Sequence, residues 1–315
     1  MIDSYGRKIN YLRVSVTKRC NLNCSYCGAC NEKDSTELTA EQIERIVKAF
    51  ADCGITKVRL TGGEPLVRRD ICDIAERISK IDGIKKLALT TNGIRLKELA
   101  KPLKEAGVSA INISLDTTDK KQYKELTGFD GLQKVFDGIA ECESVGLSPI
   151  RLNAVLIKGQ NDSQAESLIN IAKDRKIDVR FIELMPFSDE GENENLVIKG
   201  EDILKQFPFL KADPSDKTDF EKSVARYYEA EGFKGRIGFI TPISDKFCSE
   251  CNRIRLLSDG KVKVCLGNDE VIDLTDVIDE ELLRERVKKA ILSKPMEHKF
   301  NCGYGKNHGL NKIGG

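Results

Sequence analysis

Three closely spaced cysteines constrain this chain more than any other feature. Cys20, Cys24 and Cys27 follow the spacing C-x₃-C-x₂-C within the stretch CNLNCSYCGAC. The spacing is too tight for the loops that disulfides usually close, so the three thiols are expected to act together as ligands of one metal centre. A cubane of four irons held by three thiolates leaves one iron open to a small molecule. The triplet alone also allows a zinc knuckle.

A second cysteine triplet lies near the other end of the chain. Cys248, Cys251 and Cys265 are spaced C-x₂-C-x₁₃-C. Structural zinc sites normally offer four closed ligands, so a Cys₃His site would need His298 or His308 and a long loop. A second cluster with an open iron fits the three thiols better.

Two arginines stand between the ligands of the second triplet. Arg253 and Arg255 alternate on a short predicted strand, so their side chains are expected on one face. Two guanidinium forks beside an open iron would suit a ligand rich in hydrogen-bond acceptors. The alternative is a pair of solvated surface arginines.

Composition narrows the class of protein. The 315 residues carry 51 Lys+Arg and 50 Asp+Glu, a formal charge of +1, which argues against a general binder of nucleic acid or anionic membranes. No run reaches the roughly 20 apolar residues that a membrane helix needs, and MIDSYGRKIN lacks the apolar core of a secretory signal. We therefore expect a cytoplasmic protein, in which eleven cysteines favour metal ligation over disulfides.

The first part of the chain alternates strand and helix patterns. Strands are predicted over 11–16, 55–60, 87–90, 110–115, 149–157 and 178–184, with helices between them. This order predicts an α/β fold with parallel strands, and polar or glycine-rich sequence recurs where the strands end. The pattern changes after Met185, so we place a boundary near 190–200, giving regions 1–195 and 196–315. A final helix is predicted over 280–292, with Leu282, Leu283, Val287 and Ile291 on one face.

The second predicted strand runs into Thr61-Gly62-Gly63-Glu64-Pro65. Two glycines let the backbone approach a ligand, and exposed amides there could bind a carboxylate. A bare Gly-Gly is usually a turn, but this loop follows the cysteine loop by a single strand.

Basic residues occupy strands where apolar residues are expected. They are Arg13, Arg59 with Lys57, Arg151 and Arg180. Arginines that converge inside a barrel would bind an anion such as a polyphosphate. The alternative is that they face the helices and reach solvent. No G-x₄-G-K-[ST] phosphate loop is present, which disfavours an ordinary NTPase.

The cysteine loop followed by GGEP resembles the radical S-adenosylmethionine (SAM) superfamily. The resemblance implies a [4Fe–4S] cluster on Cys20, Cys24 and Cys27 whose open iron chelates SAM, which is cleaved to a 5′-deoxyadenosyl radical. It also implies that Tyr26 lies near the SAM adenine and that the loop of Gly63 holds the methionine amino group. Ser114 and Met185 match positions that line the SAM pocket.

Along nearly its whole length the chain is similar to the GTP 3′,8-cyclase family of molybdenum cofactor biosynthesis. The matching stretches are YLRVSVTKRCNLNCSYC, KVRLTGGEPLVRRD, ALTTNG, INISLDT, FIELMPF, FCSECNRIRLLSDGKVKVC and a terminal IGG. The resemblance implies an incomplete (β/α)₆ TIM-like barrel with a smaller C-terminal domain that carries a second [4Fe–4S] cluster on Cys248, Cys251 and Cys265. It implies conversion of GTP to (8S)-3′,8-cyclo-7,8-dihydroguanosine 5′-triphosphate, because the radical abstracts the 3′ hydrogen and C3′ then attacks C8.

The same resemblance assigns substrate residues. Thr90 matches a position that contacts GTP, and the diglycine Gly314-Gly315 matches a tail needed for cyclisation. Arg253 and Arg255 match the segment that meets the guanine, whose edge binds the second cluster. The positions around the triphosphate are Arg13, Arg59, Arg151 and Arg180.

An electron donor and a downstream cyclic pyranopterin monophosphate synthase are the partners that this family implies, for a monomer or homodimer. The chain departs from the family at Cys30, Arg151, His308 and Leu310. These departures leave room for a paralogue acting on another nucleotide. The alternatives are a radical SAM peptide maturase with an auxiliary cluster and a non-catalytic metal-binding protein.

Overall fold

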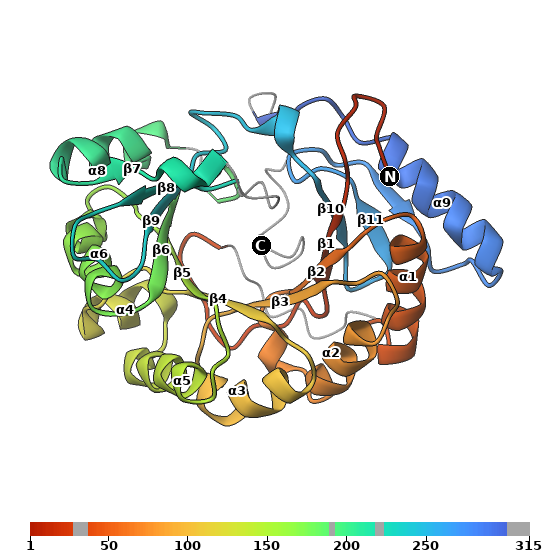
Figure 1. Ribbon diagram of the computed structural model, residues 1–315, viewed down its shortest axis with the longest axis horizontal. Coiled ribbons are helices and arrows are strands. Elements are labelled where there is room, and N and C mark those ends of the chain that lie inside the picture. Colours follow the sequence, from red (N-terminus) through yellow and green to blue (C-terminus); the bar gives the residue numbers. More distant parts are fainter. Residues whose placement is uncertain (28–36, 189–192, 218–223, 301–315) are drawn as a thin grey trace.

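One curved sheet organises the molecule (Figure 1). The computed structural model describes residues 1–27, 37–188, 193–217 and 224–300. Within them the strand order is β12-β11-β10-β1-β2-β3-β4-β5-β6-β9-β8-β7. The central strands are β1 (Tyr11–Ser15), β2 (Lys57–Thr61), β3 (Lys86–Thr91), β4 (Ala110–Ser114), β5 (Ile150–Val155) and β6 (Ile177–Ile182). All neighbours among them are parallel, as the alternating pattern predicts.

Helices cover the outer face of this sheet (Figure 1). They are α1 (Ala40–Asp52), α2 (Ile71–Ser79), α3 (Leu96–Glu105), α4 (Lys120–Thr127), α5 (Leu132–Ser144) and α6 (Ala165–Asp174). In α1, Thr39 and Gln42 form a capping box, and Ile43, Val47 and Phe50 are buried at helical spacing. The main core therefore lies between sheet and helices, which leaves the concave inner face available for polar side chains.

The second half of the chain extends the same sheet at both edges. Strand β9 (Ile237–Ile240) pairs in parallel with β6, and β10 (Arg253–Leu256) pairs in parallel with β1. Beyond them, antiparallel pairings add β8 (Arg226–Glu229) with β7 (Lys211–Ala212), and β11 (Lys261–Lys263) with β12 (Val271–Asp273). The edge strands β7 and β12 do not pair with each other, so the sheet is an incomplete barrel rather than a closed one. The incomplete barrel is confirmed, while the division into 1–195 and 196–315 stays a prediction.

The last helices complete the fold. Helix α8 (Gly200–Gln206) was not predicted from the sequence, and α9 (Glu280–Leu292) has the predicted bounds. Leu282 is 43% exposed, so its placement on the buried face is wrong. The packed face of α9 is instead Leu283, Val287, Ala290 and Ile291, because α9 touches α1 over a narrow stripe. No helix in the described ranges is both long and apolar enough to cross a membrane.

Candidate active site

A cavity of about 820 Å³ occupies the inside of the incomplete barrel. Both cysteine triplets line it, as do all the other predicted site residues that the structure describes: Arg13, Tyr26, Arg59, Gly63, Thr90, Ser114, Arg151, Arg180, Met185, Arg253 and Arg255. The predicted Gly314 and Gly315, and the divergent Cys30, His308 and Leu310, lie outside the described residues. The fold thus gathers side chains from both ends of the chain around one space.

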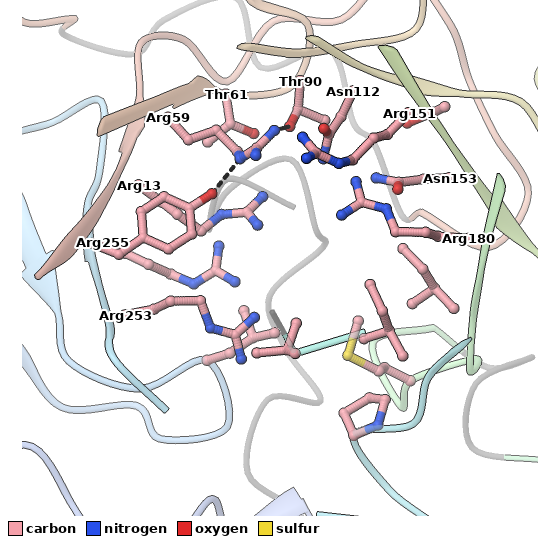
Figure 2. A pocket seen from close by; sticks show the side chains of 18 of the residues that line it. Arg13, Arg59, Thr61, Thr90, Asn112, Arg151, Asn153, Arg180, Arg253 and Arg255 are labelled. Atoms are coloured by element: carbon pink, nitrogen blue, oxygen red, sulfur yellow. Dashed lines mark hydrogen bonds between the residues drawn. The ribbon is translucent and has the colours of Figure 1, made fainter. Parts of the chain in front are cut away.

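Six of the arginines that line this cavity are labelled in Figure 2 and point into it, and we call these the arginine cluster. They come from β1, β2, β5, β6 and β10: Arg13, Arg59, Arg151, Arg180, Arg253 and Arg255. Arg59, Arg180 and Arg255 are buried, which is incompatible with side chains that face the helices and reach solvent. Strand alternation places Arg253 and Arg255 on the cavity side together, as predicted.

The arginines of the cluster repel one another. Burial and the charges of neighbouring arginines lower the pKa of Arg13 and of Arg180 to about 10, and they lower that of Arg255 well below its ordinary value. Within the described residues, Nε of Arg151 lies 3.8 Å from a carboxylate oxygen of Asp178. A polyanion entering the cavity would relieve this repulsion.

Several buried polar atoms at the cavity wall make no hydrogen bond within the described part of the chain. In the described part of the chain, Nε and Nη2 of Arg180 and Oδ1 of Asn112 and of Asn153 have no hydrogen-bond partner. These side chains lie around one space in Figure 2. Because buried polar groups are normally satisfied, this arrangement indicates a ligand with both acceptors and donors.

Arg59 is held in place from two sides. Its Nε donates a hydrogen bond to the Tyr11 hydroxyl on β1, and its Nη1 donates to Thr90 Oγ1 on β3 at 3.3 Å (Figure 2). Thr90 therefore orients an arginine as well as lining the cavity.

The first cysteine triplet lies at the carboxyl ends of the strands, together with Tyr26. Burial raises the pKa of Cys24, and the neighbouring Asp116, Cys27 and Cys20 raise it further, which indicates thiols grouped in a dry site. The Tyr26 hydroxyl donates to Asp116 Oδ2 at 2.6 Å, and Asp116 Oδ1 accepts from the Val155 amide at 2.8 Å. The ring of Tyr26 is thereby fixed beside the triplet.

The GGEP loop packs against the chain that leads into the first triplet. The amides of Gly63 and Glu64 donate to the carbonyls of Thr17 and Arg19, each at 2.8 Å. The expectation that exposed amides here bind a ligand carboxylate is therefore wrong for these two groups, because the protein already uses them. A Cβ on Gly63 would lie 2.4 Å from the Arg19 oxygen, so this close approach requires glycine.

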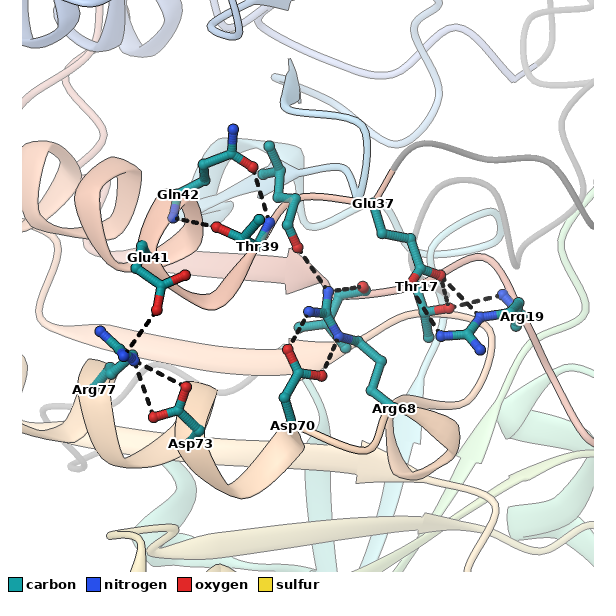
Figure 3. Close-up of polar contacts among 12 residues, drawn as sticks. Thr17, Arg19, Glu37, Thr39, Glu41, Gln42, Arg68, Asp70, Asp73 and Arg77 are labelled. Atoms are coloured by element: carbon teal, nitrogen blue, oxygen red, sulfur yellow. Dashed lines mark hydrogen bonds and ion pairs between the residues drawn. The ribbon is translucent and has the colours of Figure 1, made fainter.

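A polar network fastens both ends of the first cysteine loop (Figure 3). Buried Arg68 donates from Nη1 to the carbonyls of Val16 and Leu38, at 2.8 and 2.9 Å. Glu37 accepts hydrogen bonds from the Thr17 hydroxyl and from Arg19. The segments before Cys20 and after residue 36 are thus joined at one point.

The second triplet has a comparable anchor. Buried Arg7 donates from Nη1 to the carbonyls of Cys248 and Met296, each at 2.9 Å, and pairs with Asp3 at 2.7 Å. Burial raises the pKa of Cys251, but the charges of Arg253 and Lys294 outweigh it and lower that pKa to about 6. A thiolate is the form that ligates iron, so the surroundings favour it.

Three thiols at each triplet suit a cluster with one open iron better than a closed four-ligand zinc site. Among the described side chains, no three of His, Cys, Asp or Glu are close enough to hold one metal ion. The irons of a cubane keep its cysteine ligands further apart than a single zinc does. His298 bonds through Nε2 to the Pro242 carbonyl at 2.8 Å and is part of no three-ligand metal group among the described residues.

Comparisons with known proteins agree with this geometry. The radical SAM superfamily model matches residues 14–172, and the "Molybdenum Cofactor Synthesis C" model matches residues 177–300. A GTP 3′,8-cyclase of Alkaliphilus oremlandii is 45% identical over 100% of both chains, and one of Peptoclostridium acidaminophilum is 43% identical over 100% of this chain and 98% of its own. The chain belongs to the radical SAM superfamily and, within it, to the GTP 3′,8-cyclase family.

Solved structures show the same fold at low identity. Streptococcus suis SuiB bound to S-adenosylmethionine gives a TM-score of 0.62 at 18% identity over 88% of this chain, which spans 65% of SuiB. SuiB bound to its precursor peptide SuiA gives 0.66 at 18% identity over 98% of this chain and 71% of that chain. At such identity the likeness concerns the radical SAM fold alone.

Several residues of this radical SAM site were missed in the sequence. Asn112 and Asn153 are polar residues on otherwise apolar strands, and their strand positions were the available signal. Tyr11 looked like an ordinary strand residue. Arg7 and Arg68 gave no signal, since their roles depend on carbonyls distant in sequence.

Proposed function

We propose that this protein is a GTP 3′,8-cyclase that produces (8S)-3′,8-cyclo-7,8-dihydroguanosine 5′-triphosphate in the first step of molybdenum cofactor biosynthesis. The observation that carries the proposal is the arginine cluster, which lies in one cavity between two cysteine triplets. A polyphosphate nucleotide accounts for the arginines, and a base at the second triplet accounts for Arg253 and Arg255. Relatives named GTP 3′,8-cyclase over the full chain support the choice of nucleotide.

The residues of the cavity have distinct tasks in this proposal. Arg13, Arg59, Arg151 and Arg180 bind the triphosphate, with Thr90 holding Arg59 in orientation. Asn112 and Asn153 offer free acceptors to hydroxyl or amine groups of the substrate. Fixing GTP at both ends restricts its ribose to the space that faces the first triplet, so that the 3′ position is presented to the reaction.

Two [4Fe–4S] clusters and SAM are the cofactors that suit the two cysteine triplets of the cavity. Cys20, Cys24 and Cys27 would hold one [4Fe–4S] cluster, and Cys248, Cys251 and Cys265 a second. SAM bound at the first cluster supplies the 5′-deoxyadenosyl radical that removes the 3′ hydrogen. Tyr26, Gly63, Ser114 and Met185 line the cavity where SAM would bind. Because the Gly63 amide is bonded to Thr17, the group proposed to bind the SAM amino group is the Gly63 carbonyl. The diglycine Gly314-Gly315 is proposed to assist cyclisation.

The proposal extends to location and partners. Ligand thiols must stay reduced, which favours the cytoplasm. An electron donor must reduce the first cluster, and a cyclic pyranopterin monophosphate synthase would consume the product. The protein would act as a monomer or homodimer, without nucleic acid or membrane as a partner.

Anaerobic incubation with SAM, a reductant and GTP tests the proposal. We expect 5′-deoxyadenosine and the cyclised nucleotide to form together, as measured by mass spectrometry. Formation of 5′-deoxyadenosine without consumption of GTP would refute the cyclase and keep the superfamily. One zinc and no iron in the purified protein would refute both.

Variants of the base-binding arginines separate substrate binding from SAM chemistry. Replacing Arg253 and Arg255 by alanine should abolish GTP consumption and leave slow SAM cleavage without substrate. Arg175→Ala is the matched control, because this surface arginine pairs only with Glu143, at 3.2 Å. Equal loss of both activities in the double variant would mean that these arginines serve the fold.

A further inference from the structure

Tyr11 lines the cavity without a task in the reaction proposed above. Its hydroxyl oxygen accepts a hydrogen bond from Arg59 Nε, and the Lys57 ammonium lies 4.9 Å from the centre of its ring. Strand register places Tyr11 beside Lys57 on β2 and beside Arg253 on β10. The phenol therefore stands at the start of β1 with basic side chains on both neighbouring strands.

The other acids of the cavity are engaged elsewhere. Among the described lining residues the carboxylates are Glu64 and Asp116, at the carboxyl ends of the strands. Glu64 accepts from Thr91 and Asn92, and Asp116 accepts from Tyr26. Neither is hydrogen-bonded to an arginine of the cluster, so the phenol is the acid that contacts Arg59.

The groups that face Tyr11 are basic on every strand packed against it. Strand β1 itself contributes Arg13, β2 contributes Lys57 and Arg59, and β10 contributes Arg253. Lys8 and Lys86 line the same cavity. Burial alone would raise the pKa of Tyr11, but the charges of Arg59, Arg13 and Lys57 outweigh it and lower the pKa to about 7.

We propose that Tyr11 is an internal counter-anion of Arg59 in the nucleotide-free protein, and that binding of a polyphosphate returns it to the neutral phenol. As the phosphates neutralise the arginines, the phenolate oxygen takes one proton from solvent and forms an O–H bond, and no electrons are transferred. Substrate binding is thereby coupled to proton uptake. The inference rests on the proposed function, since it assigns the polyphosphate to this site.

The coupling predicts a pH dependence of affinity. Above about pH 7 the empty site holds a phenolate that competes for the arginines, so polyphosphate affinity should fall by close to tenfold per pH unit. A tyrosine that only positions Arg59 would give no such slope. Phe at position 11 keeps the ring and removes the ionisable oxygen.

Inorganic tripolyphosphate is the probe, added to the anaerobic holoenzyme of the wild type and of Tyr11→Phe at the same pH, because its terminal phosphates also titrate in this range. Calorimetry in buffers of different ionisation enthalpy measures proton exchange together with the dissociation constant. We expect the wild type to take up close to one proton more per bound probe than Tyr11→Phe, since protons from the probe are common to both. Above about pH 7 the ratio of the two affinities should change by close to tenfold per pH unit.

A spectroscopic measurement identifies the group that titrates. The sequence contains no Trp, so a decrease of the near-ultraviolet tyrosinate band on adding tripolyphosphate is free of indole absorption. Tyr5→Phe is the matched control, because Tyr5 is 54% exposed and does not line the cavity. The Tyr5→Phe control should show the same proton uptake as the wild type and the same decrease of the tyrosinate band.

Two results would overturn the inference. One is a wild-type protein that takes up no more protons on binding tripolyphosphate than Tyr11→Phe does, and the other is a Tyr11→Phe variant weakened by the same factor at every pH. Because the probe contains neither base nor ribose, these outcomes do not depend on GTP turnover. Proton-linked binding in a protein that does not cyclise GTP would refute the proposed function and leave this inference intact.

Discussion

The guanidinium of Arg7 donates a hydrogen bond to the backbone oxygen of Cys248, 241 positions further along the chain, at 2.9 Å. The same group donates to the carbonyls of Met296 and Pro295 and pairs with buried Asp3. A residue of the N-terminal segment therefore fixes the loop that carries the second triplet. Arg68 fixes the first triplet in the same manner, through the carbonyls of Val16 and Leu38.

Loss of Arg7 should remove the second cluster selectively. Arg7→Ala leaves several carbonyls and the Asp3 carboxylate without their donor, a change that typically costs about 3–5 kcal/mol when a buried pair is broken. We expect iron to fall from about eight toward about four per chain, with GTP use lost and SAM cleavage retained. Iron analysis and the two product assays measure this. Arg286→Ala is the control, since its partner Asp276 is 64% exposed, and a fully loaded, active Arg7→Ala protein would contradict the role.

Loss of Arg68 should instead affect the first cluster. Arg68→Ala removes the donor that joins the two ends of the cysteine loop, and each buried carbonyl left without a partner costs about 1–3 kcal/mol. We expect SAM cleavage to fall at least tenfold, together with GTP use. The neighbouring Arg69 is exposed, so Arg69→Ala is a control within the same motif. If both variants cleave SAM equally well, the hydrogen bonds of Arg68 have no role in SAM cleavage.

The sequence predicted the strands and helices better than the long-range contacts of Arg7 and Arg68. Strand–helix alternation identified β1 to β6, because each βα unit is encoded locally by the period of its apolar residues. The parallel pairing of β10 with β1 joins Tyr11 to Arg253 across most of the chain, and no local pattern encodes such a contact. The inward direction of Arg59 and Arg180 was predicted from convergence, whereas the engaged amides of Gly63 and Glu64 depend on where residues 17–19 pass.

Glu64 should give the protein a pH-dependent stability. Its carboxylate accepts hydrogen bonds from Leu66, Thr91 and Asn92, but burial outweighs them and raises the pKa to about 7 from 4.5. A raised native pKa means that the contribution of Glu64 is fully present below the unfolded value and is lost as pH rises through about 7. That shift corresponds to a loss on the order of 3 kcal/mol.

Glu64→Gln removes this titration. Thermal unfolding of wild type and variant between about pH 5 and pH 8 should show the wild type losing stability relative to the variant as pH rises. Comparing the two proteins cancels the contribution of other groups, such as Asp116, whose pKa burial raises to about 6. A stability difference that does not change with pH would show that Glu64 is ionised throughout.

The buried charge of Arg180 is expected to lower the stability of the fold and to contribute to substrate binding. Replacing Arg180 should therefore affect the two properties in opposite directions. The side chain points into the cavity (Figure 2), is 7% exposed, and has Nε and Nη2 without partners among the described residues. Burial and neighbouring arginines lower its pKa to about 10 from 12.5, so the charge is held at a cost in the empty protein. Arg180→Met keeps much of the apolar stem and removes that charge.

We therefore expect Arg180→Met to increase the free energy of unfolding of the ligand-free holoenzyme by about 1–3 kcal/mol, which raises its thermal midpoint. The variant should also abolish GTP consumption. SAM cleavage without GTP should persist, because Arg180 is assigned to the triphosphate and not to SAM. Arg175→Met changes a surface arginine by the same atoms and should alter neither property. A destabilised Arg180→Met protein would mean that the guanidinium is satisfied within the fold, and the cavity would then lack the unpaired charge that makes it a polyphosphate site.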